Sequence, residues 1–171
     1  MKRIGLLSDT HSKVYPGIFD FFKDCDEVWH AGDIGNTETY DMLDRFKNLR
    51  AVYGNIDGTE IRTLCPEVQN FYCEGVKVIM KHIGGYPGRY DISVRQLIDI
   101  EKPDLFISGH SHILKIIYDD KKKLLHMNPG AAGHYGLHQL ITCIRFVIDG
   151  KKIENVEIME TDRKSPAGSL P

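Results

Sequence analysis

The sequence has few of the features that mark membrane, secreted or nucleic-acid-binding proteins. No stretch approaches the ~20 consecutive apolar residues of a membrane-spanning helix, and the apolar run at residues 4–7 is too short for a signal peptide. The net charge of −2 gives no general attraction to nucleic acid or to an anionic membrane. We therefore expect a cytoplasmic protein with no membrane partner. The sequence gives no strong sign of nucleic-acid binding, and it leaves a homo-oligomer open.

Cysteine is also scarce. The four cysteines are scattered and form no C-x-x-C pair; they are Cys25, Cys65, Cys73 and Cys143. This spacing argues against a cysteine zinc site, and a chain long enough for a sizeable core has little need of a disulfide framework. We expect four buried, reduced thiols.

Apolar segments in the first two thirds of the chain alternate between strand and helix patterns. We expect strands at residues 4–7, 27–30, 49–53, 76–80 and 105–108. We expect helices at residues 18–22, 37–46 and 92–100. Asn36 or Thr37 is the expected N-cap of the second helix.

The last third contains four strand patterns, at residues 113–118, 123–126, 142–148 and 153–158. Two turn-forming segments, at residues 119–121 and 149–151, join them into hairpins. Strand–helix alternation followed by hairpins predicts an α/β domain with mixed sheets. The predicted domain covers residues 1–160, and residues 161–171 are expected to form a flexible C-terminal tail.

Polar side chains that bind metals follow several of the predicted strands. The seven candidates are Asp9, His11, Asp33, Asn55, His82, His110 and His112. Ligands of open α/β sheets bind outside the carboxyl ends of the strands, so these side chains should converge although they are far apart in sequence. Each short motif alone is commonly a turn or a cap. The ordered set, with every member at a strand end, favours a site.

The ligand types indicate which metals would bind. Aspartate, asparagine and histidine offer oxygen and nitrogen atoms that suit manganese, iron, zinc, nickel or cobalt, and they are too rich in nitrogen for calcium. Seven ligands are too many for one tetrahedral site, whereas they suit two ions that share a carboxylate. Gly32, Gly54 and Gly109 stand beside candidate ligands, where the backbone must turn sharply.

These residues resemble the signature of the calcineurin-like metallophosphoesterases, which is D-x-H, G-D, G-N-x-[ED], a lone histidine and G-H-x-H. The chain carries all five motifs in order, at residues 9–11, 32–33, 54–57, 82 and 109–112. The similarity spans residues 3–134 and includes Asn128-Pro129-Gly130. Size and the Gly-Asn-x-Asp form are most similar to the small YfcE-type phosphodiesterases. The resemblance implies a four-layer αββα sandwich of two mixed sheets flanked by helices.

The resemblance also implies a role for each ligand. Asp9, His11, Asp33 and His112 would bind one divalent ion, and Asp33 would bridge to a second ion held by Asn55, His82 and His110. Manganese is the expected metal, with nickel, iron, zinc or cobalt as alternatives. Asp33, Asn55 and His11 are the expected catalytic residues, and a metal-bridging hydroxide would attack a small phosphoester substrate.

A charge count favours diesters over monoesters. Two divalent ions supply four positive charges, whereas Asp9, Asp33 and one hydroxide remove three. A phosphodiester carries a single negative charge and would neutralise the remainder. The motifs leave open a phosphomonoesterase or a nucleotide pyrophosphatase, because they specify metals and not the leaving alcohol.

Two positions depart from the family pattern. Ile56 stands where many members have a histidine that protonates the leaving group, so this proton must come from elsewhere, such as His11, His134 or His138. The histidine expected two residues after His82 is absent, and Arg89 is instead expected to reach the substrate phosphate, with Tyr86 or Tyr90 stacking on an organic group. The altered position 56 is the one feature that favours a non-catalytic scaffold similar to the retromer subunit of this fold.

Overall fold

The structure is a computed structural model, and it describes residues 1–164. One five-stranded sheet has the order β10 (Lys152–Asp162), β9 (Leu140–Asp149), β1 (Lys2–Leu7), β2 (Glu27–His30) and β3 (Asn48–Ala51). A second has the order β4 (Val68–Cys73), β5 (Val76–Lys81), β6 (Leu105–Ile107), β8 (Leu124–Pro129) and β7 (Leu114–Asp119). The helices are α1 (Gly17–Phe21), α2 (Thr37–Phe46), α3 (Thr59–Leu64) and α4 (Ile92–Glu101).

Both sheets are mixed. In the first sheet, β1, β2 and β3 run parallel, whereas β9 is antiparallel to both β1 and β10. In the second, β5, β6 and β8 run parallel, and β4 and β7 pair antiparallel at the two edges. The two predicted hairpins are therefore confirmed as β7–β8 and β9–β10.

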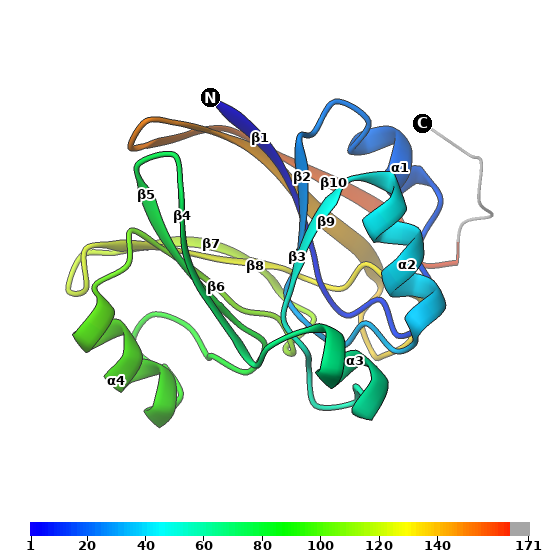
Figure 1. Cartoon of the computed structure of the whole chain (residues 1–171), viewed down its shortest axis with the longest axis horizontal. Helices are drawn as coiled ribbons and strands as arrows, with labels where there is room; N and C mark the ends of the chain where they lie inside the picture. Colours follow the sequence, from blue (N-terminus) through cyan, green and yellow to red (C-terminus); the bar gives the residue numbers. More distant parts are fainter. Residues whose placement is uncertain (165–171) are drawn as a thin grey trace.

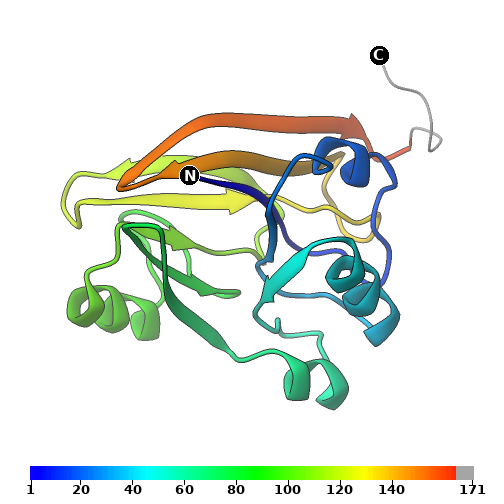
Figure 2. The same cartoon turned by 45° about the horizontal axis from the view of Figure 1, so that its top comes forward.

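The layers follow from the alternation of side chains along each strand. In β1, Leu6 packs into the core between the sheets, whereas Leu7 packs on the outer face with residues of α1 and α2. In β6, Ile107 faces the other sheet and Phe106 packs against α4. Figures 1 and 2 show α4 outside one sheet and α1 and α2 outside the other. The expected αββα sandwich is confirmed.

Two elements were missed by the sequence analysis. Strand β4 is an edge strand with polar residues such as Gln69 and Asn70, so its apolar pattern is weak. Helix α3 has six residues, which is too short for a helical period to be read. Asn36 is the N-cap of α2, because its side chain accepts a hydrogen bond from the Thr39 amide at 2.9 Å.

The C-terminal boundary differs from the prediction. Strand β10 pairs with β9 as far as Asp162, two residues beyond the expected end of the domain. Residues 165–171 of the expected tail lie outside the described residues. Within residues 1–164, none of the helices is long and apolar enough to cross a membrane. All four cysteines lie in this range, where they are buried free thiols, as expected.

Candidate metal centre

The candidate ligands are held on loops with an unusual backbone. Five of the seven residues have a positive φ between 45° and 66°, a region that side chains other than glycine rarely adopt; they are Asp9, His11, Asp33, His110 and His112. Such conformations cost about 1–3 kcal/mol each and persist where the surrounding structure enforces them. All five residues lie in the loops after β1, β2 and β6. This concentration indicates that the strained backbone serves to position the candidate ligands, at a cost in the stability of the fold.

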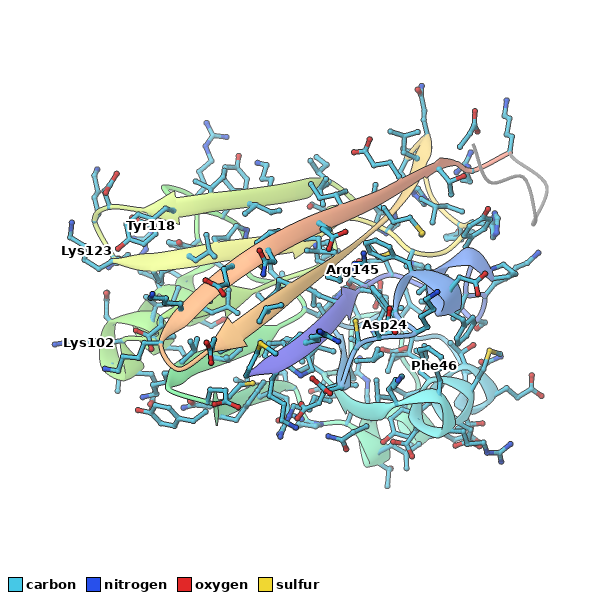
Figure 3. The ribbon with its side chains drawn as sticks, turned by 90° about the horizontal axis from the view of Figure 1, so that it is seen from above. Asp24, Phe46, Lys102, Tyr118, Lys123 and Arg145 are labelled. Carbon is cyan, nitrogen blue, oxygen red and sulfur yellow. The ribbon has the colours of Figure 1, made fainter. Side chains whose placement is uncertain are left out.

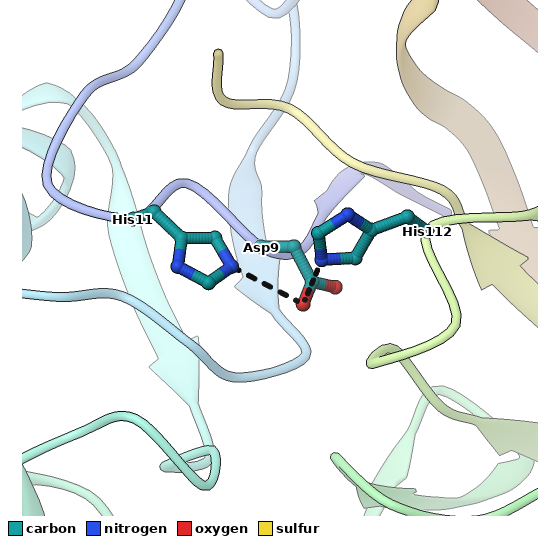
Figure 4. Close-up of side chains that lie close together, drawn as sticks. All are labelled: Asp9, His11 and His112. Atoms are coloured by element: carbon teal, nitrogen blue, oxygen red, sulfur yellow. Dashed lines mark ion pairs between the residues drawn. The ribbon is translucent and has the colours of Figure 1, made fainter. Parts of the chain in front are cut away.

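One group of ligands forms around Asp9, which is fully buried after β1. His112 Nε2 lies 3.2 Å from Asp9 Oδ1, and His11 Nε2 lies 3.9 Å from the same oxygen. Figure 4 shows the two imidazoles on either side of the carboxylate. The other oxygen, Oδ2, accepts hydrogen bonds from Ser8 Oγ at 2.6 Å and the His110 amide at 3.1 Å. These bonds fix Asp9 with Oδ1 facing the histidines.

A second group forms around Asp33. His82 Nε2 lies 3.3 Å from Asp33 Oδ2, and His110 completes a set whose ligand atoms lie within 4.8 Å of one another. Asn55 Oδ1 lies 3.1 Å from His82 Nε2. Asp33 Oδ2 is also 3.7 Å from His11 Nε2 in the first group. The structure thus brings all seven candidates together, with Asp33 between the groups.

Two buried atoms in this cluster have no hydrogen-bond partner among the described residues. They are Asp9 Oδ1 and His11 Nε2. Buried polar atoms are almost always paired, so both atoms need another partner. A divalent cation could be this partner, because the candidate ligand atoms around the two unpaired atoms are carboxylate oxygens, an amide oxygen and imidazole nitrogens.

Second contacts set the proton position on two of the histidines. A carbonyl oxygen only accepts, so the 2.7 Å contact between His82 Nδ1 and Ala31 O places a proton on Nδ1. The opposite ring nitrogen, Nε2, faces Asp33 and Asn55 and would bind a metal once it loses its proton. Such outer contacts fix the ring orientation and raise ligand basicity in metal sites.

His112 is oriented through another histidine. His138 Nε2 donates to Gly133 O at 2.9 Å, so the Nδ1 atom of a neutral His138 accepts. His112 Nδ1 lies 3.1 Å from this acceptor and must donate to it. The lone pair of His112 Nε2 is therefore directed at Asp9 and its group.

The central pair is electrostatically coupled. Burial raises the pKa of Asp33, but the hydrogen bond and charge of His82 and the Ile56 amide outweigh it and lower the pKa overall. Burial lowers the pKa of His82, but Asp33 and Asp9 outweigh it and raise the pKa. Metal binding would displace the His82 proton, so affinity should rise with pH.

Two glycines allow the ligand loops to approach closely. A Cβ at Gly54 would lie 2.0 Å from Asp33 Oδ1, and a Cβ at Gly32 would lie 2.6 Å from His82 Nδ1. Gly32 also has a φ of +99°. Any side chain at either position would displace a candidate ligand, which explains the glycine next to each ligand in the sequence.

Buried polar residues tie the loops together. Asp57 accepts hydrogen bonds from the Ile34, Gly35 and Gly54 amides at 2.7–3.2 Å, and it thus links the loops after β2 and β3. His30 accepts from the Gly32 amide at 3.1 Å and contacts Thr10 Oγ1 at 2.9 Å. Both residues support ligand loops and do not face the cluster.

Hollows open on three sides of the cluster. The first, of about 450 Å³, contains Asn55, His82, Arg62 and Lys81. A second, of about 490 Å³, runs along His110, His112 and His138. A third, of about 120 Å³, adjoins His110 beneath the loop after β5. Another cavity, lined by residues that include Asp24 and Arg145 (Figure 3), contains none of the candidate ligands.

The residues expected to contact substrate lie in different environments. Arg89 is exposed on the loop after β5, and its side chain makes none of the hydrogen bonds found within residues 1–164. Tyr86 lines the small hollow beside His110. Tyr90 is buried, and its hydroxyl donates to Asp119 Oδ2 at 3.0 Å, which makes it a packing residue.

The structure gives some residues roles that the sequence did not indicate. The sequence named His138 only as one possible proton donor, whereas its contact with His112 makes it a residue that orients a ligand. The exposed Tyr135 ring lies 5.1 Å from the His11 ring, centroid to centroid. Ile56 is 45% exposed beside Asp33, and its amide donates to Asp33 Oδ1 at 3.0 Å.

The chain is similar to several known proteins. Residues 1–151 match the calcineurin-like phosphoesterase superfamily domain. A probable metallophosphoesterase of Methanothermobacter thermautotrophicus is 29% identical over 92% of this chain and 92% of its own length. One of Methanocaldococcus jannaschii is 31% identical over 75% of this chain and 67% of its own. Wild-type Vps29 of Entamoeba histolytica, solved with zinc, has a TM-score of 0.72 at 19% identity, covering 95% of this chain and 99% of that one.

Proposed function

Because the chain belongs to the calcineurin-like phosphoesterase superfamily, we propose that it is a dinuclear metal-dependent phosphodiesterase. The observation that carries the proposal is the pair of adjoining ligand groups, Asp9–His11–His112 and Asp33–His82–His110. Divalent ions held by these residues would supply a metal-bound hydroxide as the nucleophile and would stabilise the negative charge of the phosphate oxygens.

The residues of the chain divide the work. The Asp33 carboxylate lies between the two groups, with Oδ1 held by the Ile56 amide and Oδ2 facing the histidines, as a bridging ligand requires. Asn55 would bind the second ion and donate its amide N–H to a phosphate oxygen. His11, with its unpaired Nε2, would bind the first ion beside the attacking group.

The preference for diesters rests on charge. The two ions, two aspartates and one hydroxide leave one positive charge, and a diester neutralises it. A monoester brings about two negative charges at neutral pH and would need a further cation.

Manganese and a cytoplasmic location are further parts of the proposal. The set of carboxylate, amide and imidazole ligands suits manganese, and it suits nickel, iron, zinc and cobalt in similar geometry. Metal analysis of protein purified from its native host would identify the ion.

The decisive experiment measures hydrolysis and metal content together. The purified chain is assayed with manganese on a panel of diesters, monoesters and dinucleotide pyrophosphates, before and after chelation. Asp33→Ala removes the carboxylate shared by both groups and should lose both metals and at least 1,000-fold in kcat/KM. Asp99→Ala, on the exposed surface of α4, serves as the control.

Each outcome separates the readings. Diester hydrolysis that is lost on chelation and in Asp33→Ala supports the proposal. Faster hydrolysis of monoesters or pyrophosphates would reassign the substrate class on the same site. Inactivity with manganese, nickel, iron, zinc and cobalt would support a non-catalytic scaffold. The chain has the same fold as Vps29.

A further inference from the structure

The small cavity beside His110 has a composition of its own. It encloses about 120 Å³ between the loop after β5 and the loop after β6. It shares His110 with the second ligand group, so a molecule bound there would adjoin the metals. Its other polar lining residues are Tyr86, Ser111, Lys115, His126 and Asn128. At ~30 Å³ per water, the space suits one small chemical group.

His126 lacks partners in this cavity. Its side chain is fully buried, stacked on Phe106 with ring centroids 5.6 Å apart. Neither ring nitrogen has a hydrogen-bond partner among residues 1–164. A neutral imidazole carries one N–H donor and one acceptor, and leaving both unpaired is costly. A bound group in the cavity would remove this cost.

Lys115 places a positive charge in the cavity, and this charge has no carboxylate partner among residues 1–164. Its Nζ lies 3.5 Å from the centroid of the Tyr86 ring, and no ion pair to it occurs within residues 1–164. In the larger hollow near Asn55, by contrast, Lys81 Nζ lies 3.1 Å from Glu67 Oε1. Lys115 is therefore a cation in the small cavity whose charge is paired with no carboxylate of residues 1–164.

Ser111 adds a third donor. Its Oγ accepts from Asn128 Nδ2 at 3.2 Å and from the Ile113 amide at 3.3 Å. Because both contacts use the oxygen as an acceptor, the hydroxyl hydrogen remains available. The cavity thus offers an ammonium group, a hydroxyl and an imidazole N–H.

We propose that this cavity binds an anionic substituent, a carboxylate or a phosphate, carried by the alcohol group of the phosphodiester substrate. The assignment rests on the proposed function for its substrate class. A diester neutralises the metal centre, which leaves the positive charge of Lys115 unmatched, and an anionic substituent on the alcohol group would offset it. The donors also suit an anion better than a neutral polyol.

Binding of small probes to the zinc-loaded full chain tests this assignment. Glycerol 3-phosphate and 3-hydroxypropanoate represent the two anions, and glycerol is the neutral control. NMR signals of the His126 ring report occupancy of the cavity without requiring catalysis. Both anions, or the one that fits, should shift these signals at concentrations where glycerol does not.

Matched lysine variants then separate the cavity from the metals. Lys115→Met should lower the affinity for the anion by about tenfold, which is the usual contribution of one charge-assisted hydrogen bond. Lys123→Met removes the same charge at the exposed tip of the same hairpin (Figure 3) and should change nothing. Anions that bind without moving His126, or that bind Lys115→Met unchanged, would overturn the assignment. Absence of diesterase activity in the unmodified chain would instead overturn the proposed function.

Discussion

The contact between His112 and His138 allows a metal site to be weakened without touching a ligand. Asparagine at position 138 places an amide oxygen near the position of Nδ1 and keeps the acceptor for His112. Glutamine places its amide near the position of Nε2 and keeps only the contact with Gly133 O. We expect His138→Gln to weaken the ion held by Asp9, His11 and His112, and His138→Asn to retain it.

The magnitude follows from the geometry. The bond between the two rings is 3.1 Å long, and a neutral hydrogen bond contributes about 1 kcal/mol, or about fivefold in affinity. The loss of a fixed proton position on His112 adds to this. We expect about tenfold weaker binding in His138→Gln, at the lower end of the 10–100-fold found when outer contacts of metal ligands are removed.

Metal titration by calorimetry provides the assay, with competition by a chelator to separate the two ions. One of the two affinities should fall in His138→Gln, while the other stays within about threefold. His134→Gln is the control, because His134 contacts the Arg163 carbonyl and none of the candidate ligands. Unchanged affinity for both ions in His138→Gln would refute the positioning role.

Three further predictions concern other parts of the site and the core. Arg89→Ala should raise KM for diesters about tenfold with little change in kcat, and an unchanged KM would remove Arg89 from the site. With Ile56 unable to protonate a leaving group, rates on aryl diesters should fall steeply with leaving-group pKa, and a flat profile under limiting chemistry would contradict this. Burial, then Lys115, lowers the pKa of His126 to about 4. The unfolded chain binds this proton near pH 6.5, so His126 by itself should lower the stability of the metal-free protein by about 3 kcal/mol between pH 6.5 and pH 4. Urea unfolding should show a smaller fall for His126→Phe.

The sequence predicted the elements that carry strong local signals. The run Ile4–Leu7 and the pair Val28–Trp29 are apolar because both faces of these parallel strands are covered. Strand β4 and helix α3 were missed, because an edge strand needs few apolar residues and a short helix shows no period. The end of β10 was placed too early, because its exposed, charged residues resemble a tail.

By itself, the sequence determined which residues could bind metal and in what order, because strand ends and their polar residues are local features. Only the tertiary structure decided how they meet. The loops after β1, β2, β3, β5 and β6 converge because the carboxyl ends of the parallel strands in two packed sheets lie at one edge. The pairing of His138 with His112 and the isolation of Lys115 likewise depend on packing between distant segments. No local pattern encodes such contacts, so the role of His138 as a partner of His112 and the unpaired charge of Lys115 could not be predicted before the fold was known.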